Sequence, residues 1–137
     1  MKIYFAGSIR GGRDDKDIYL QIIELLKTYG DVLTEHIGNS ELTSYGESIS
    51  DEFIYNRDMK WLNGADVVVA EVTTPSLGVG YEIGKAESNK PVLCIYRKIE
   101  NKRVSAMLAG NSNLLVKEYS DLATLTPIFA NFFKSLS

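Results

Sequence analysis

Short apolar runs, separated by segments with helical spacing, constrain the fold of this chain more than any other feature. The clearest run is ADVVVAEV at 65–72, which is apolar at almost every position. A strand of this kind is typical of a parallel sheet, because helices cover such a sheet on both faces. Four more runs are expected to form strands, at 2–7, 31–36, 90–97 and 113–119.

The segments between these runs carry apolar residues at the spacing of amphipathic helices. Helices are expected over 17–30, 47–63, 78–89 and the tail 120–136. The tail opens with Ser120 as an N-cap, and Pro127 is expected to mark a break or restart within it. This alternation predicts an α/β fold, a doubly wound five-stranded parallel sheet with right-handed crossovers and the flavodoxin-like strand order 2-1-3-4-5.

Length, charge and cysteine content narrow the possibilities further. The 137 residues suit a single domain, 1–137, and no linker or repeat interrupts them. The net charge of −3 provides no basic excess for binding a nucleic-acid polymer or an anionic membrane, so any phosphate must be bound locally. The one cysteine, Cys94, fits a reducing compartment. The apolar run at the N-terminus is too short for a signal peptide or a membrane span, so a cytoplasmic location is expected.

Two unusual loops are expected to meet at one edge of the sheet. The first strand runs into GSIRGGR (7–13) and the third into EVTTPSLGVGYE (71–82). Ligands bind in this fold beyond the carboxyl ends of strands, at the switch point between those two strands. Glycine N–H groups and the guanidinium of Arg10 or Arg13 suit a phosphate, although a tight turn with solvated arginines is the simpler alternative. The spacing matches neither a P-loop nor the dinucleotide fingerprint.

Two carboxylates are candidates for chemistry. Glu82 is expected in the first turn of the helix at 78–89, where the helix dipole would stabilise its ionised form by about 0.3–1 kcal/mol. An ionised, positioned carboxylate can serve as a nucleophile, although a Glu that merely complements the dipole is common. Asp58 shares a helix face with Ile54, or else pairs with a neighbouring cation on a solvated face. Paired carboxylates flanking an anomeric carbon are the usual equipment of glycosyl transfer.

Three other side chains have open interpretations. Tyr4 is expected in the core, with its hydroxyl free to orient a carboxylate near the strand end. His36 follows the second strand and either lines a binding site or is an ordinary surface histidine. Cys94 is expected to pack in the core. One histidine and one cysteine provide no zinc-ligand spacing, so no metal site is expected.

Several separated segments resemble the 2′-deoxynucleoside 5′-monophosphate N-glycosidase family, within the nucleoside 2-deoxyribosyltransferase superfamily. The segments are YFAGSIRGGR, LTEH, DMKWLNGADVVVAEVTTPSLGVGYEIGKA and VSAML. They occur in the family's order with similar spacing, from about residue 2 to residue 108. The resemblance implies hydrolysis of a deoxynucleoside monophosphate to a free base and 2-deoxyribose 5-phosphate, with no metal or organic cofactor.

The resemblance also implies roles for individual residues. Glu82 would attack C1′ of the sugar, Asp58 would transfer a proton and contact the sugar, and Tyr4 would orient the nucleophile. The residues expected to bind the 5′-phosphate are Gly7, Ser8, Ile9, Arg10 and Gly11, with Ser76 and Gly78 adding contacts. Ser105 and Met107 would reach the active site of a neighbouring subunit, which implies a homodimer with shared active sites.

Three other functions stay open at this point. One is a deoxyribosyltransferase acting on unphosphorylated nucleosides, against which the arginines of GSIRGGR argue. A second is a ribonucleotide N-glycosidase of the cytidine-monophosphate type. The third is a nucleotide-binding sensor without chemistry, against which the presence of both Glu82 and Asp58 argues.

Overall fold

A computed structural model describes residues 1–8, 15–34 and 49–137 of the chain. Its five strands form one sheet in the order β2-β1-β3-β4-β5, and all neighbouring strands are parallel. This confirms the predicted fold class and strand order. The strands are β1 (Lys2–Ala6), β2 (Asp31–Val32), β3 (Val67–Glu71), β4 (Val92–Arg97) and β5 (Leu115–Tyr119).

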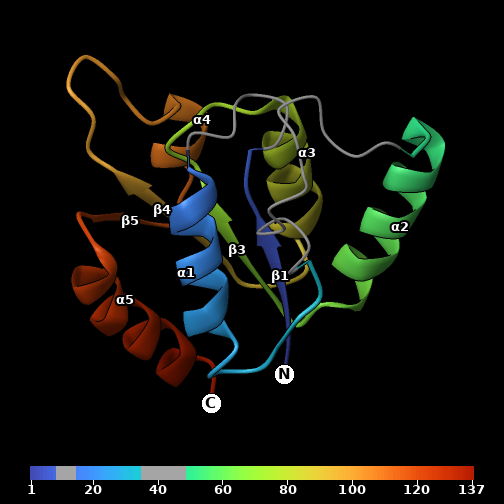
Figure 1. Ribbon diagram of the computed structural model, residues 1–137, viewed down its shortest axis with the longest axis horizontal. Coiled ribbons are helices and arrows are strands. Elements are labelled where there is room, and N and C mark those ends of the chain that lie inside the picture. Colours follow the sequence, from blue (N-terminus) through green and yellow to red (C-terminus); the bar gives the residue numbers. More distant parts are fainter. Residues whose placement is uncertain (9–14, 35–48) are drawn as a thin grey trace.

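Helices cover both faces of the sheet (Figure 1). They are α1 (Lys16–Leu26), α2 (Asp51–Gly64), α3 (Leu77–Ala86), the short α4 (Ala106–Ala109) and α5 (Leu122–Ser135). Buried side chains of α1 and α5 pack on one face, and those of α2 and α3 pack on the other. Within the described ranges, no helix has the length and apolar character needed to cross a membrane.

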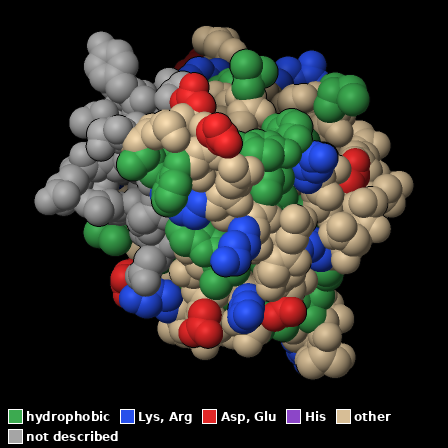
Figure 2. Space-filling view, turned by 90° about the vertical axis from the view of Figure 1, so that its right-hand side faces the viewer, with side chains coloured by type: hydrophobic (Ala, Val, Ile, Leu, Met, Phe, Trp, Pro, Cys, Tyr) green, Lys and Arg blue, Asp and Glu red, His purple; other side chains and the backbone are tan. Residues whose placement is uncertain are grey.

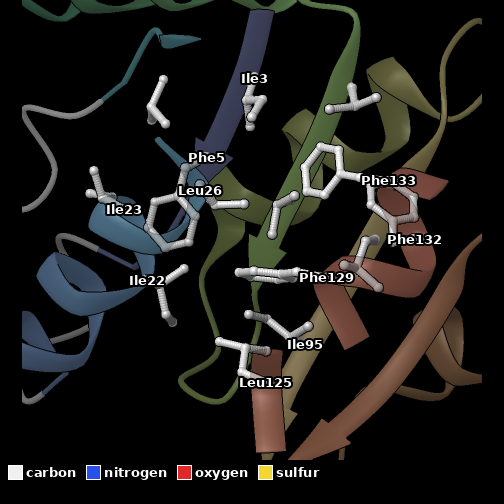
Figure 3. Close-up of a cluster of buried hydrophobic side chains, with 14 of the residues drawn as sticks. Ile3, Phe5, Ile22, Ile23, Leu26, Ile95, Leu125, Phe129, Phe132 and Phe133 are labelled. Carbon is white, nitrogen blue, oxygen red and sulfur yellow. The ribbon is translucent and has the colours of Figure 1, made fainter. Parts of the chain in front are cut away.

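The alternation of side chains along β1 decides what each face receives. Ile3 and Phe5 point to the α1 and α5 side, where they join the cluster of buried hydrophobic side chains drawn in Figure 3. Tyr4 and Ala6 point to the α2 and α3 side. Because successive side chains of a strand alternate, the burial of Ile3 and Phe5 aims Tyr4 at the opposite layer.

The second strand is shorter than expected. The sequence predicts a strand over 31–36, but β2 ends at Val32, and residues 35 and 36 lie outside the described part of the chain. Beyond Val32, the side chain of Thr34 forms hydrogen bonds with the backbone of β1. The buried Thr34 hydroxyl accepts a hydrogen bond from the Phe5 N–H (2.9 Å) and donates one to the Phe5 carbonyl (2.6 Å).

The prediction of a break at Pro127 is wrong, since α5 continues through it. The loss of one N–H donor in the second turn is offset by the burial of the helix's apolar face against the core. That face consists of Leu125, Phe129, Phe132 and Phe133. The N-cap is Asp121 and not Ser120, because Asp121 forms a reciprocal capping box with Thr124.

Candidate active site

Tyr4 and Glu82 meet between the first strand and α3. The Tyr4 side chain is buried, and its hydroxyl donates a hydrogen bond to a carboxylate oxygen of Glu82. Burial, followed by the nearby Glu82 carboxylate, raises the pKa of Tyr4 well above its usual value. The phenol therefore keeps its proton and acts as a permanent donor to Glu82.

Glu82 occupies the second turn of α3, so its predicted place in the first turn is wrong. The helix begins at Leu77 because the Ser76 side chain caps it, accepting a hydrogen bond from the Val79 N–H (3.3 Å). Burial raises the pKa of Glu82 to about 7, the hydrogen bond from Tyr4 opposes that rise, and the charge of Asp58 adds to it. Desolvation, and not the helix dipole, thus dominates the protonation of this carboxylate.

Asp58 on α2 lies close enough to influence both groups. Its charge raises the pKa of Tyr4 and of Glu82. One Asp58 oxygen accepts a hydrogen bond from Nε of Arg57 at 3.0 Å, and Nη2 lies at 3.0 Å as well. The predicted pairing with a neighbouring cation is therefore present, but on a partly buried face, since the Asp58 side chain is 23% exposed. The Arg57 guanidinium stacks over the Trp61 ring, 4.9 Å from its centroid.

The described end of the first loop is tightly packed. A Cβ on Gly7 would lie 2.9 Å from a ring carbon of Tyr19, so the close approach of the two residues requires glycine. The Tyr19 hydroxyl accepts a hydrogen bond from the Ser8 N–H at 2.9 Å. Ser8 is fully buried, and its own hydroxyl has no hydrogen-bond partner within the described ranges. A buried hydroxyl in this condition is suited to a ligand's oxygen.

Four residues predicted to bind substrate lie outside the described residues: Ile9, Arg10, Gly11 and His36. Their roles stay predictions. Gly7 and Ser8 are the part of the predicted phosphate loop that the structure places, at the carboxyl end of β1.

The glycines of α3 leave its outer surface bare. Among the described residues, a Cβ on Gly78 would meet nothing closer than the Ser76 hydroxyl, at 3.9 Å, and one on Gly80 or Gly84 would meet nothing within 4 Å. Packing against the described residues therefore does not require glycine at these positions. The substrate contacts expected of Ser76 and Gly78 stay predictions.

Ser105 and Met107 belong to α4. The Ser105 hydroxyl caps this helix by accepting a hydrogen bond from the Met107 N–H at 3.2 Å. Met107 is 82% exposed, and among the large apolar residues that the structure describes only Leu77, at 96%, is more exposed. Exposed hydrophobic side chains also gather on the face toward the viewer in Figure 2. On α2, Phe53 and Tyr55 are about half exposed.

A buried polar network near this edge was not anticipated from the sequence. Asp15, before α1, accepts a hydrogen bond from the Thr74 hydroxyl (2.9 Å) and pairs with Arg97 at the end of β4. Glu71, at the end of β3, is fully buried and accepts a hydrogen bond from the Tyr119 hydroxyl. The signal that could have revealed the network is the presence of this acidic residue at the end of an otherwise apolar strand.

The described parts of the chain contain no group of three or more His, Cys, Asp or Glu residues suited to a metal. The chemistry that the arrangement supports is that of a partly buried carboxylate with a pKa near neutrality, a tyrosine donor bound to it, and a second carboxylate within electrostatic range.

Comparison with known proteins identifies the family. The model of the family described as nucleoside 2-deoxyribosyltransferase matches residues 3–116. The chain belongs to this family. This confirms the resemblance predicted from the sequence.

Members of the nucleoside 2-deoxyribosyltransferase family and its fold differ in the activity that their names state. The 5-hydroxymethyl-dUMP N-hydrolase of Esox lucius is 47% identical over 144 residues, covering 100% of this chain and 99% of the relative. The protein of the same name from Tetraodon nigroviridis is 50% identical over 125 residues, covering 87% and 88%. The solved structure of a CMP N-glycosidase from Clostridium botulinum has a TM-score of 0.67 at 16% identity, covering 96% of this chain and 99% of that one. This last likeness shows the fold alone.

Proposed function

We propose that this protein hydrolyses the N-glycosidic bond of 2′-deoxynucleoside 5′-monophosphates, releasing a free base and 2-deoxyribose 5-phosphate. The observation that carries the proposal is the Glu82 carboxylate, bound by the Tyr4 hydroxyl and electrostatically coupled to Asp58. Full-length relatives named 5-hydroxymethyl-dUMP N-hydrolase support a phosphorylated deoxynucleoside as substrate. They also make 5-hydroxymethyl-dUMP a specific candidate.

The proposed reaction has two steps on Glu82. Its ionised carboxylate attacks C1′ of the sugar, the bond from C1′ to the base nitrogen breaks, and the base leaves with that electron pair and takes up a proton. Water then attacks C1′ of the glycosyl ester and gives up a proton, which replaces the proton that the base took from Asp58. This step returns the Glu82 carboxylate and releases 2-deoxyribose 5-phosphate. A 2-deoxy sugar suits this route, because it lacks the electron-withdrawing hydroxyl that would oppose positive charge at C1′.

Tyr4 and Asp58 support this nucleophile in different ways. The Tyr4 hydroxyl fixes one carboxylate oxygen of Glu82 and favours its ionised form. Asp58 is proposed to contact the sugar and to transfer the proton that the leaving base requires. Its ion pair with Arg57 holds the carboxylate in place before substrate binds.

The 5′-phosphate is proposed to bind where the buried Ser8 hydroxyl lies, with Gly7, Ile9, Arg10 and Gly11 around it and with Ser76 and Gly78 opposite. His36 is proposed to line the same site. Binding energy from this remote group can hold C1′ against Glu82, which turns the attack into an intramolecular event. Replacing Arg10 with Ala should therefore weaken the binding of nucleotides far more than the binding of nucleosides. Equal losses of affinity for both would contradict the assignment of this loop to the phosphate.

We further propose a homodimer in which Ser105 and Met107 complete the partner's site. The exposure of the apolar Met107 side chain supports a contact with a second subunit at α4. Sedimentation velocity on the purified protein would measure the oligomeric state. A monomer at working concentrations would contradict this part of the proposal.

We also infer one domain over residues 1–137 and a cytoplasmic location. A single sheet with two buried clusters supports the first inference. The second rests on the single cysteine, Cys94, which cannot form a disulfide within the chain and so fits a reducing compartment.

The deciding experiment is chromatography of the free base released from the four dNMPs and from 5-hydroxymethyl-dUMP. The matching deoxynucleosides and ribonucleotides serve as comparison substrates, and the Glu82→Ala variant serves as the inactive control. Release from deoxynucleotides alone supports the proposal. Release from nucleosides in the presence of an acceptor base would indicate a transferase, release from CMP a ribonucleotide glycosidase, and binding without release a sensor.

A further inference from the structure

Asp15 stands at the N-cap position of α1 but does not cap that helix. No N–H group in the first turn of the helix donates to its side chain. Both carboxylate oxygens are used elsewhere: Oδ2 accepts a hydrogen bond from the Thr74 hydroxyl at 2.9 Å, and Oδ1 pairs with the Arg97 guanidinium. An aspartate at this position usually satisfies the helix's own donors, so its diversion to two distant residues needs an explanation.

The partners of Asp15 are fixed by a second layer. Arg97 lies with its Nε 3.6 Å from a Glu71 oxygen, and its backbone N–H donates to the Thr73 hydroxyl at 2.9 Å. Glu71 accepts hydrogen bonds from the Thr73 N–H (2.7 Å) and hydroxyl (3.0 Å). Because Asp15 and Glu71 are buried, these bonds have little competition from water and hold their members rigidly.

The network joins the two segments that the proposed reaction must keep in register. Asp15 occupies the N-cap position of α1, and the hydroxyl of Tyr19 in that helix accepts a hydrogen bond from the N–H of Ser8, the residue proposed to bind the phosphate. Thr74 lies two residues before Ser76, the cap of the helix that carries Glu82. The bond between Thr74 and Asp15 therefore spans 59 positions of sequence and links the phosphate side of the site to the nucleophile side.

We propose that Asp15, held by Thr74 and Arg97, is a positioning residue that sets the distance between the bound 5′-phosphate and the Glu82 carboxylate. This inference rests on the proposed function and adds to it residues that do not contact the reacting atoms. It follows that the network matters for phosphorylated substrates, whose phosphate anchors C1′, and matters little for nucleosides, which have no such anchor.

The test compares Thr74→Val with Thr74→Ser. Valine removes the hydroxyl and keeps the shape, whereas serine keeps the bond to Asp15 and introduces no change of charge. The matched control is Asp121→Ala, which removes the cap of α5, outside the site, and lowers stability without touching the network. kcat and KM are measured for a dNMP and for its deoxynucleoside, and thermal unfolding is recorded for every variant.

We expect Thr74→Val to lower kcat/KM for the dNMP about tenfold, the usual effect of losing one hydrogen bond to a charged group, and to leave the deoxynucleoside value unchanged. Thr74→Ser should match the wild type, and Asp121→Ala should not change the ratio between the two substrates. The inference is overturned if Thr74→Val lowers both values equally, or lowers neither.

Wild-type protein that releases no base from any substrate would contradict the proposed function and not the positioning role. Calorimetric binding of 2-deoxyribose 5-phosphate then decides the inference. Affinity about tenfold weaker in Thr74→Val than in Thr74→Ser supports it. Equal affinities in the two variants, or no binding by the wild type, overturn it.

Discussion

The Tyr4 hydroxyl donates a hydrogen bond to the Glu82 carboxylate and so joins β1 to α3 across 78 positions of sequence. The tyrosine keeps its proton because burial and the neighbouring carboxylate raise its pKa. The pKa of Glu82 is about 7, because burial raises it while the hydrogen bond from Tyr4 lowers it. Tyr4 therefore favours the ionised form of Glu82, and this effect can be tested by removing the Tyr4 hydroxyl.

Replacing Tyr4 with Phe should raise the pKa of Glu82 further, because the variant loses the hydrogen bond that favours the ionised carboxylate. A nucleophilic Glu82 is active when ionised, so kcat/KM should rise with pH through its pKa. We expect this rising limb to lie near pH 7 in the wild type and about one pH unit higher in the variant. The measurement is kcat/KM for base release as a function of pH, in the wild type and in the variant. If the rising limbs of the two profiles coincide, Tyr4 does not change the pKa of Glu82.

Glu82→Gln should abolish turnover and stabilise the fold at alkaline pH. The folded-state pKa of about 7 exceeds the ordinary value of 4.5, so the folded protein binds more protons between these values and loses stability as the pH rises. Above pH 7 the wild type is destabilised by the buried, ionised Glu82 carboxylate, whereas the variant has no such charge. The variant should therefore be more stable by about 1–3 kcal/mol at pH 8, a range that allows for the partial exposure of the side chain. Urea unfolding at pH 8 and pH 4 checks this. A difference that does not shrink at pH 4 would contradict a titration of Glu82.

The sheet and its order could be predicted because they depend on local patterns. The unbroken apolar run of β3 specifies a strand covered on both faces, and strand–helix alternation leaves few topologies. The same reasoning brings the ends of the first and third strands together, since they adjoin in this order. The resemblance to the family then indicates Glu82 as the carboxylate that Tyr4 would orient.

What could not be predicted depends on contacts between distant residues. Glu82 was expected in a first turn, but the Ser76 cap starts the helix earlier and burial reverses the expected direction of the pKa shift. Pro127 was expected to break a helix that packing holds together. The pairing of Asp15 with Arg97 joins residues that no local pattern relates.

Gly7→Ala should destabilise the protein and impair nucleotide hydrolysis. The new Cβ would lie 2.9 Å from Cε2 of Tyr19, and that ring is buried and packed edge-on against Phe5 at 5.6 Å between centroids. The hydroxyl of the same tyrosine accepts a hydrogen bond from the Ser8 N–H, so a shift of Tyr19 would move Ser8 as well. We expect a loss of about 1–3 kcal/mol in urea unfolding.

The matched control for this prediction is Gly84→Ala. Gly84 lies inside α3, and a Cβ there would meet no atom within 4 Å in the part of the chain that the structure describes. Alanine there should stabilise the helix by up to about 0.5–1 kcal/mol. If Gly7→Ala proved as stable as Gly84→Ala, the close packing of Gly7 on Tyr19 would not be a constraint.

A shared active site predicts complementation between two inactive variants. Glu82→Ala removes the nucleophile, and Met107→Asp places a charge on an apolar side chain that is 82% exposed in the single chain and proposed to enter the partner's site. In a hybrid dimer of the two, one site carries both lesions, while the other combines an intact Glu82 with an intact Met107. Subunits that are mixed and refolded should therefore regain base release. Random pairing of equal amounts makes about half of the dimers hybrids, each with one working site of two, so the activity should approach about a quarter of the wild-type value. Each variant refolded alone is the control. If Met107 acted within its own subunit, no hybrid site would be intact and the mixture would stay inactive.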